Sequence, residues 1–170
     1  MATPIQQNLA DKNAAYAETF DQGALQLPPS KRYLLVTCMD ARIDTSEAFG
    51  IGLGEAHVLR NAGGNAKDAL RSIVISQQFL GTREIVLIKH TKCGMLTFTN
   101  EEAHAIVEKN LGPHVRPALE KLGDFQPFSN LEEAVKSDVK WLKEHDLVLR
   151  DIPITGWVYD VETGNVKNIV

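Results

Sequence analysis

The stretch from Tyr33 to Arg42, YLLVTCMDAR, decides the fold that we expect for this chain. It begins with a short, unbroken apolar run that ends at Thr37, which is typical of a β-strand covered on both of its faces. The residues that follow include Cys38, Asp40 and Arg42, all of them able to bind or react. In parallel sheets, ligands bind beyond the carboxyl ends of the strands. The sequence therefore predicts a buried strand that leads into a functional loop.

A second stretch of the same kind lies further along the chain. Residues 84–94 read EIVLIKHTKCG, in which 84–89 is the most apolar strand candidate and His90, Cys93 and Gly94 follow it. Both cysteines of the chain thus come soon after a predicted strand. Because the carboxyl ends of parallel strands share one edge of a sheet, we expect both of these loops at the same edge.

The rest of the chain alternates helical and strand patterns. Strands interleaved with helices indicate an α/β fold, with a mainly parallel central sheet flanked by helices. The last two strands, joined by a turn at 162–165, predict an antiparallel C-terminal hairpin. The expected helices are 4–20, 66–80, 101–110 and 131–145, and the remaining strands are 56–59, 152–161 and 166–170.

Length, charge and hydropathy narrow the class of protein. A chain of 170 residues has the size of one domain. The net charge is -4, and the lysines and arginines are scattered rather than gathered in the basic stripe that binds nucleic acids. No apolar run approaches the roughly 20 residues that cross a bilayer, and the N-terminus lacks the pattern of a signal peptide. We expect a cytoplasmic protein without nucleic-acid or membrane partners.

Cys38, His90 and Cys93 form a candidate zinc site. The spacing His90-x-x-Cys93 lets both side chains reach one ion from a single loop, and Cys38 arrives from another strand. Two thiolates and an imidazole suit zinc, and three protein ligands leave a fourth tetrahedral position open, as in catalytic sites. The competing interpretation is that the two cysteines are unrelated buried thiols.

Asp40 and water compete for that fourth position. Arg42 carries a planar guanidinium group that can hold a carboxylate through two hydrogen bonds. If Arg42 holds Asp40, a water molecule can occupy the fourth position and Asp40 can orient it. If Arg42 is removed, Asp40 can bind the zinc and block it. The sequence leaves both arrangements open.

The two motifs together resemble the signature of the β-class carbonic anhydrases. The resemblance rests on Cys38-x-Asp40-x-Arg42, on His90-x-x-Cys93-Gly94 and on the segment 60–63, and it spans residues 30–100. It implies one Zn²⁺ per chain on Cys38, His90 and Cys93, and a catalytic Asp40–Arg42 pair. It further implies a single zinc-binding domain, 1–170, with residues 1–30 as a helical arm that reaches the partner in a homodimer or homotetramer.

Several positions depart from the family pattern. Ala41 stands where many members have serine, and Leu35 stands where some members have a tryptophan of an inhibitory bicarbonate pocket. Arg60 corresponds to an arginine of that pocket, but without the tryptophan we do not expect this regulation. The short chain and its CMDAR motif also resemble enzymes that hydrolyse carbonyl sulfide or carbon disulfide.

Three functions are consistent with these residues. The first is the reversible hydration of CO2 to bicarbonate and a proton, with Asp40 and Arg42 as the catalytic pair. The second keeps the same site for hydrolysis of carbonyl sulfide or carbon disulfide, which are linear molecules like CO2. The third is a non-catalytic zinc or redox-sensing module, which predicts a fourth protein ligand and no turnover.

Other polar residues have simpler interpretations. We expect His57 to be a structural histidine in the second strand rather than a catalytic group. Arg60, at the end of that strand, has either a salt bridge or a role in the site. Gly63–Gly64 is interpreted as a tight turn rather than an anion cradle, and Asp44 as the cap of a helix. Surface positions are expected for His104, His114 and His145.

Overall fold

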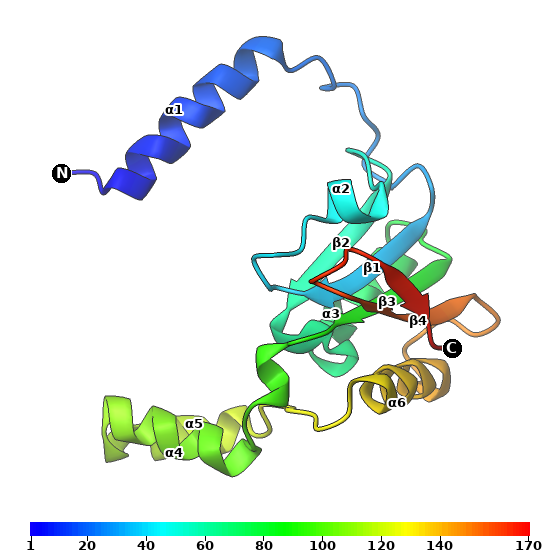
Figure 1. The fold of residues 1–170 in the computed structure, drawn as a ribbon. Helices are drawn as coiled ribbons and strands as arrows, with labels where there is room; N and C mark the ends of the chain where they lie inside the picture. Colours follow the sequence, from blue (N-terminus) through cyan, green and yellow to red (C-terminus); the bar gives the residue numbers. More distant parts are fainter.

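A single five-stranded sheet organises the structure, a computed structural model that describes residues 1–170 (Figure 1). The strand order is β2-β1-β3-β4-β5; the first four strands are parallel, and β5 is antiparallel to β4. The predicted α/β class, with its C-terminal hairpin, is therefore confirmed. The strands are β1 Tyr33–Cys38, β2 Ala56–Asn61, β3 Glu84–His90, β4 Ile154–Tyr159 and β5 Val166–Asn168.

The helices agree with the predicted ranges to within two residues. A short helix after Pro113 was not predicted, because this helix has no side-chain cap and buries one residue, Leu119. No helix combines the length and the apolar character that a bilayer span requires. The helices are α1 Pro4–Thr19, α2 Thr45–Phe49, α3 Ala66–Gln78, α4 Asn100–Leu111, α5 Arg116–Leu122 and α6 Leu131–Glu144, with short 3-10 turns η1 Ala62–Gly64, η2 Gly94–Leu96 and η3 Pro113–Val115.

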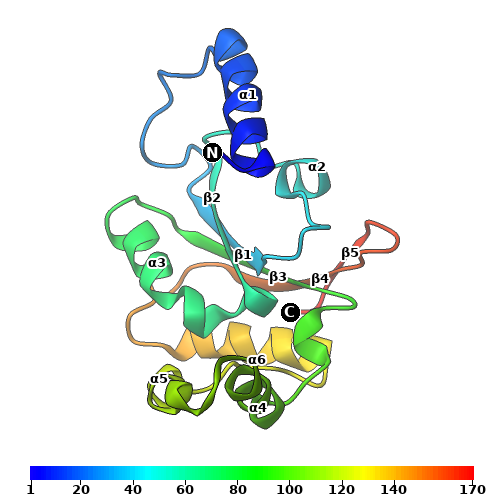
Figure 2. The same ribbon diagram turned by 90° about the vertical axis from the view of Figure 1, so that its left-hand side faces the viewer.

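Helices α3 and α6 cover one face of the sheet (Figure 2). Alternate strand residues point into this layer, since side chains in a strand alternate between its faces. Each buried aliphatic side chain contributes about 1.5–3 kcal/mol to folding. The core on this face comprises Leu34, Val36, Ala66, Ala69, Ile73, Ile85, Leu87, Val135, Val139, Leu142, Val148, Ile154 and Val158.

The opposite face carries a second, smaller core. It includes Leu35 and Ile88 from the two central strands and both cysteines, so the candidate site is continuous with this core. Helix α2 closes it, where Phe49 packs edge-on against Tyr159 with ring centroids 5.5 Å apart. Asp44 accepts hydrogen bonds from backbone N–H groups at the start of α2, so the predicted cap is confirmed.

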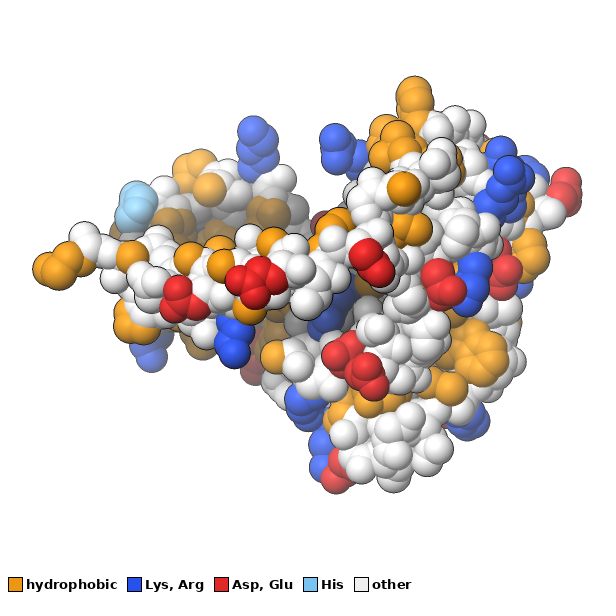
Figure 3. Space-filling view, turned by 90° about the horizontal axis from the view of Figure 1, so that it is seen from above, with side chains coloured by type: hydrophobic (Ala, Val, Ile, Leu, Met, Phe, Trp, Pro, Cys, Tyr) orange, Lys and Arg blue, Asp and Glu red, His pale blue; other side chains and the backbone are white.

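Helix α1 projects away from the body of the molecule (Figure 1). It begins at a capping box in which the side chains of Thr3 and Gln6 bond to each other's backbone. None of its residues is buried, and apolar side chains are exposed along it and in the segment that follows (Figure 3). They include Ile5, Leu9, Tyr16, Phe20 and Leu27. The arm thus presents apolar surface that has no partner within its own chain.

Gly156 in β4 sets the distance between the sheet and α6. A Cβ atom at this position would lie 2.4 Å from Val135 Cγ1 and 2.9 Å from Val139 Cγ2. Real Cβ atoms are not found at such distances, so the helix packs directly against the glycine backbone. Any side chain here would displace α6, and we expect the core to lose stability as a result.

We predict that Gly156→Ala lowers the free energy of unfolding by about 1–3 kcal/mol, the usual cost of overpacking a core. Chemical denaturation followed by circular dichroism measures this change. The control is Gly23→Ala, because a Cβ there makes an ordinary 3.9 Å contact with Phe20. That variant should stay within about 0.5 kcal/mol of the parent. Equal stability of the parent and Gly156→Ala would contradict the proposed packing.

Candidate metal centre

The pairing of β1 with β3 brings the candidate ligands together. The two strands are parallel neighbours, and Thr37 is paired with Ile88. Cys38 at the end of β1 and His90 at the end of β3 therefore emerge at the same edge of the sheet. The chain then turns back at Thr91–Lys92, where Lys92 has a positive φ of 53°, and returns Cys93 to that edge.

The three side chains form one buried cluster. The donor atoms of Cys38, His90 and Cys93 all lie within 4.8 Å of one another, and the residues are 4%, 0% and 3% exposed. The two sulfur atoms are 4.0 Å apart. Two thiolates on one zinc, each about 2.3 Å from the ion at a tetrahedral angle, lie roughly 3.8 Å apart. The cluster thus has the donors and the spacing of a zinc site.

The ring of His90 is oriented as in metal-binding histidines. Nδ1 lies 2.9 Å from the carbonyl oxygen of Thr91 and donates to it, because a carbonyl oxygen can only accept. Nε2 then carries a free lone pair directed into the cluster. It is buried and has no hydrogen-bond partner, and the nearest Asp40 oxygen is 3.7 Å away. A buried acceptor without a partner is costly, and a metal ion would satisfy it.

The two cysteine side chains are in hydrogen-bond contact. The hydrogen bond from Cys93 is the main cause that lowers the pKa of Cys38, to about 4. The same contact raises the pKa of Cys93, because a second negative charge beside the first is unfavourable. The contact thus favours ionisation of Cys38 over that of Cys93, and a divalent cation would favour the loss of both protons.

Arg42 binds both carboxylate oxygens of Asp40. Its Nε donates to Asp40 Oδ1 at 2.9 Å and its Nη2 donates to Oδ2 at 2.7 Å. The backbone N–H of Arg42 also donates to Oδ1, at 2.9 Å, and Nη2 reaches the carbonyl of Lys92 at 3.1 Å. These hydrogen bonds keep the pKa of Asp40 well below its usual range. Of the two arrangements that the sequence left open, the structure contains the one in which Arg42 holds Asp40.

Arg60 organises the loop of the first motif. Its Nε donates to the carbonyl oxygen of Cys38 at 3.0 Å, and its Nη2 donates to that of Asp40 at 2.6 Å. The salt bridge considered for this residue is absent. Arg60 thus stabilises the backbone that carries a candidate ligand and the candidate catalytic carboxylate.

The remaining histidines have structural contacts. His57 lies 2.7 Å from Ser76 Oγ and is part of a hydrogen-bonded chain, as expected for a structural histidine. The expectation that His104 lies on the surface is wrong, because its ring is half-buried. Nε2 of His104 bonds to the carbonyl oxygen of Gly123 at 2.9 Å, and the ring packs against Phe125. His145 is also half-buried, against Trp141, whereas His114 is exposed.

Sequence reasoning missed Lys89, the residue before His90. It is 1% exposed and pairs with Asp138 of α6 at 3.0 Å. Its position in the sequence could have indicated its burial, because it lies near the end of the apolar run EIVLIKH. A strand covered on both faces leaves no room there for a hydrated ammonium group. Gly63–Gly64 forms the predicted tight turn, and its carbonyl oxygens face this lysine.

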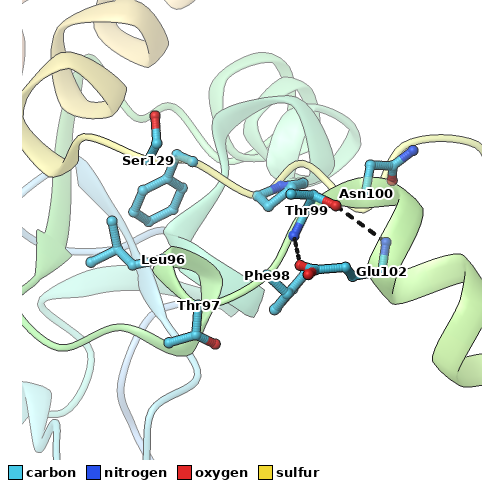
Figure 4. A pocket seen from close by; sticks show the side chains of 9 residues that line it. Leu96, Thr97, Phe98, Thr99, Asn100, Glu102 and Ser129 are labelled. Carbon is cyan, nitrogen blue, oxygen red and sulfur yellow. Dashed lines mark hydrogen bonds between the residues drawn. The ribbon is translucent and has the colours of Figure 1, made fainter.

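A separate pocket of about 440 Å³ lies beside η2 (Figure 4). Thr99 and Glu102 lie on one side of it, where each side chain bonds to the other's backbone at the start of α4. Leu96 and Ser129 lie on the other (Figure 4), and Phe128 also lines the pocket. None of the predicted site residues lines this pocket, so it is distinct from the metal centre.

Comparison with known proteins agrees with this geometry. The family model for carbonic anhydrase matches residues 33–166. The chain is 39% identical to β-carbonic anhydrase 1 of Mycobacterium tuberculosis, over 92% of this chain and 93% of that protein. It is 35% identical to a carbon disulfide hydrolase of an Acidianus strain, over 83% of this chain and 78% of that protein.

Solved structures give the same assignment. The carbonic anhydrase of Glaciozyma antarctica superposes with a TM-score of 0.93 at 46% identity, over 99% of this chain and all of that one (100%). That of Streptococcus mutans has a TM-score of 0.90 at 42% identity and covers 100% of both chains.

Fold and site together define an α/β protein with a Cys–His–Cys centre at the carboxyl edge of a parallel sheet. The chain belongs to the β-class carbonic anhydrases, enzymes that hydrate CO2. The resemblance recognised in the two sequence motifs is confirmed.

We predict that Arg42→Ala raises the pKa of Asp40 toward the ordinary aspartate value of about 3.9, because the hydrogen bonds that stabilise the carboxylate are lost. In the parent protein the pair stabilises the fold above that pH, and this contribution disappears as the pH falls through the lowered pKa. Carbon-13 NMR of the side-chain carboxyl groups, in protein freed of metal by a chelator, measures the shift.

The control for this experiment is Lys31→Ala. That change removes the ion pair between Lys31 and Glu55, whose atoms are 2.8 Å apart at the surface. It should leave the titration of Asp40 unchanged. An Asp40 titration that is the same with and without the Arg42 guanidinium would show that the pair does not control this carboxylate.

Proposed function

We propose that this chain binds one zinc ion through Cys38, His90 and Cys93 and hydrates CO2 to bicarbonate and a proton, reversibly. The observation that carries the proposal is the unpartnered Nε2 of His90, buried beside two sulfur atoms 4.0 Å apart. The whole of 1–170 acts as one catalytic domain, with residues 1–30 as its arm.

When bound, zinc supplies Lewis acidity that makes water a nucleophile near neutral pH. The charges of two thiolates cancel that of the ion, so we expect a weaker Lewis acid than with three imidazoles and an activity that rises on the alkaline side of neutrality. The three candidate ligands, Cys38, His90 and Cys93, are almost completely buried. Bulk water therefore has little access to their sulfur and nitrogen atoms.

Asp40 orients the attacking water. Its carboxylate stays ionised because Arg42 lowers its pKa, so it accepts a hydrogen bond from the water and directs the oxygen lone pair toward the carbon of CO2. Arg42 also prevents the carboxylate from entering the ligand set. The reaction joins one water oxygen to CO2 and releases one proton. A carboxylate with such a low pKa holds this proton only briefly, so the proton passes to the buffer.

Hydrolysis of carbon disulfide or carbonyl sulfide is the second candidate. It is supported by the identity of 33–35% to carbon disulfide hydrolases from three organisms. The same nucleophile would attack the carbon of these linear molecules and release hydrogen sulfide. Greater identity to carbonic anhydrases of similar length favours CO2 as the substrate.

A non-catalytic zinc or redox-sensing module is disfavoured by the ligand count. Such a site needs a fourth protein ligand, and the cluster contains three candidate ligands. Asp40, the nearest further candidate, is held through both oxygens by Arg42. This arrangement supports a centre that keeps a position for solvent and substrate.

The exposed arm supports a homodimer or homotetramer. Helix α1 has 16 residues and buries none of them within its own chain. Its apolar side chains would be covered if the arm crossed to a second copy of the chain. Burial of such a surface is the main driving force of protein association.

We predict that Asp40→Asn lowers kcat/KM for CO2 hydration about 100-fold or more, because the amide cannot replace the charged acceptor that orients the water. Stopped-flow hydration with a pH indicator measures the rate, and metal analysis should still find one zinc per chain. The control, Glu55→Gln, changes a surface carboxylate paired with Lys31 and should keep the parent rate.

Activity assays of the parent enzyme distinguish between the candidate substrates. Bicarbonate formation from CO2 and sulfide release from carbonyl sulfide and carbon disulfide are measured on one sample of known zinc content. We expect CO2 to have the highest kcat/KM. If zinc-loaded protein above pH 8 fails to exceed the buffer rate with CO2 yet releases sulfide, the second candidate replaces the first.

We predict that Leu9→Asp combined with Tyr16→Asp weakens self-association, because charges then occupy the apolar surface of the arm. Sedimentation velocity should show a shift toward monomer at micromolar concentration. Leu122→Asp in α5 introduces the same charge at another exposed apolar position and serves as the control. An unchanged oligomeric state in the arm variant would exclude the arm from the interface.

A further inference from the structure

Lys89 is a buried charge for which the proposed reaction has no use. Its Nζ donates hydrogen bonds to the carbonyl oxygens of Gly63, at 2.9 Å, and Gly64, at 3.1 Å, and pairs with Asp138 at 3.0 Å. It also lies 4.9 Å from the ring centre of Phe128. These contacts use all three N–H donors of the ammonium group.

The placement of Lys89 follows from the alternation of β3. His90 directs its ring to the cluster, so the preceding side chain points to the opposite face, toward α6 and η1. An apolar residue of similar length would pack there without the cost of removing an ammonium group from water. The hydrogen bonds of Lys89 to the turn are therefore the contacts that an apolar residue could not replace.

The Gly63–Gly64 turn lies between the two cysteine loops. A Cβ atom on Gly64 would be 3.0 Å from the carbonyl carbon of Thr37 and 3.1 Å from the backbone nitrogen of Cys38. A Cβ atom on Gly63 would be 2.9 Å from Cγ of Met95, in the turn that follows Cys93. The turn thus touches the backbone of one candidate ligand and the segment next to another.

We propose that Lys89 is a positioning residue of the metal centre, which holds the Gly63–Gly64 turn in place and thereby fixes the two cysteine loops relative to His90. The inference rests on the proposed role of Cys38, His90 and Cys93 as ligands. It adds a residue that precedes His90 in β3 and is hydrogen-bonded to a turn in close contact with the two segments that carry the cysteines.

The alternative is a purely structural pair. Asp138 also accepts a hydrogen bond from the backbone N–H of Ala66 at 3.1 Å, so the pair joins β3, α6 and the start of α3. Loss of a structural pair would lower stability without changing the metal centre. The test must therefore report on the site separately from the stability of the fold.

The test compares Lys89→Met/Asp138→Asn with Asp138→Asn alone. The double variant removes both charges, so neither remains buried without a partner, whereas the single variant keeps the hydrogen bonds from Lys89 to the turn. We expect the double variant to bind zinc about 10–100-fold more weakly than the parent, the usual effect of losing a residue that supports metal ligands. Asp138→Asn should lose much less.

Zinc affinity is measured by competition with a chromophoric chelator. Cobalt(II) in the same site provides a second readout, because its thiolate charge-transfer and d–d bands report the number of sulfur ligands and the tetrahedral geometry. These bands should weaken or shift in the double variant. A folded double variant with parental zinc affinity and parental cobalt bands would overturn the proposal. If the parent itself lacks the cobalt–thiolate bands, the proposed metal site fails instead.

Hydrogen exchange on the parent protein keeps the proposal testable if the double variant does not fold. Lys89 holds the turn whether or not zinc is bound, so the peptide 61–66 should keep its protection after zinc is removed with a chelator. Loss of that protection would show that the metal, and not Lys89, holds the turn, and would overturn the proposal.

Discussion

The parallel pairing of β1 with β3 is the constraint on which the site depends. It places Cys38 and His90 at adjacent strand ends, and the short return from His90 to Cys93 then completes a three-donor cluster. Both faces of the sheet are closely packed, which fixes the positions of β1 and β3. The core therefore also determines where the sulfur and nitrogen donor atoms lie. A shift of one residue between these strands would turn His90 to the other face and abolish the site.

Charged side chains lie on two sides of the Cys38–His90–Cys93 cluster. On the solvent side, Arg42 binds both oxygens of the Asp40 carboxylate. On the core side, Lys89 holds the glycine turn that borders the first cysteine. Arg60 joins the loop backbone to the end of β2. Each of these three cationic side chains thus binds a segment that borders the cluster.

Much of this arrangement follows from sequence patterns that act over short distances. The apolar runs of β1 and β3, the helical spacing in α3 and α6 and the two motifs were sufficient to predict the sheet, its hairpin and the Cys–His–Cys cluster. Contacts between distant segments carry no such pattern. The pairing of Lys89 with Asp138, the hydrogen bonds from Arg60 to the loop and the burial of His104 are set by tertiary packing. Helix α5 was missed because it is short and lacks a cap.

The projection of α1 away from the rest of the chain makes the stability of this helix depend on the protein concentration. An isolated helix of its length is only marginally stable in water, since few residues share the cost of nucleation. Contacts with a second molecule would supply the missing free energy, and the population of such contacts rises with concentration. The helical content of a dilute sample should therefore fall below that of a concentrated one, while the sheet and its cluster remain intact.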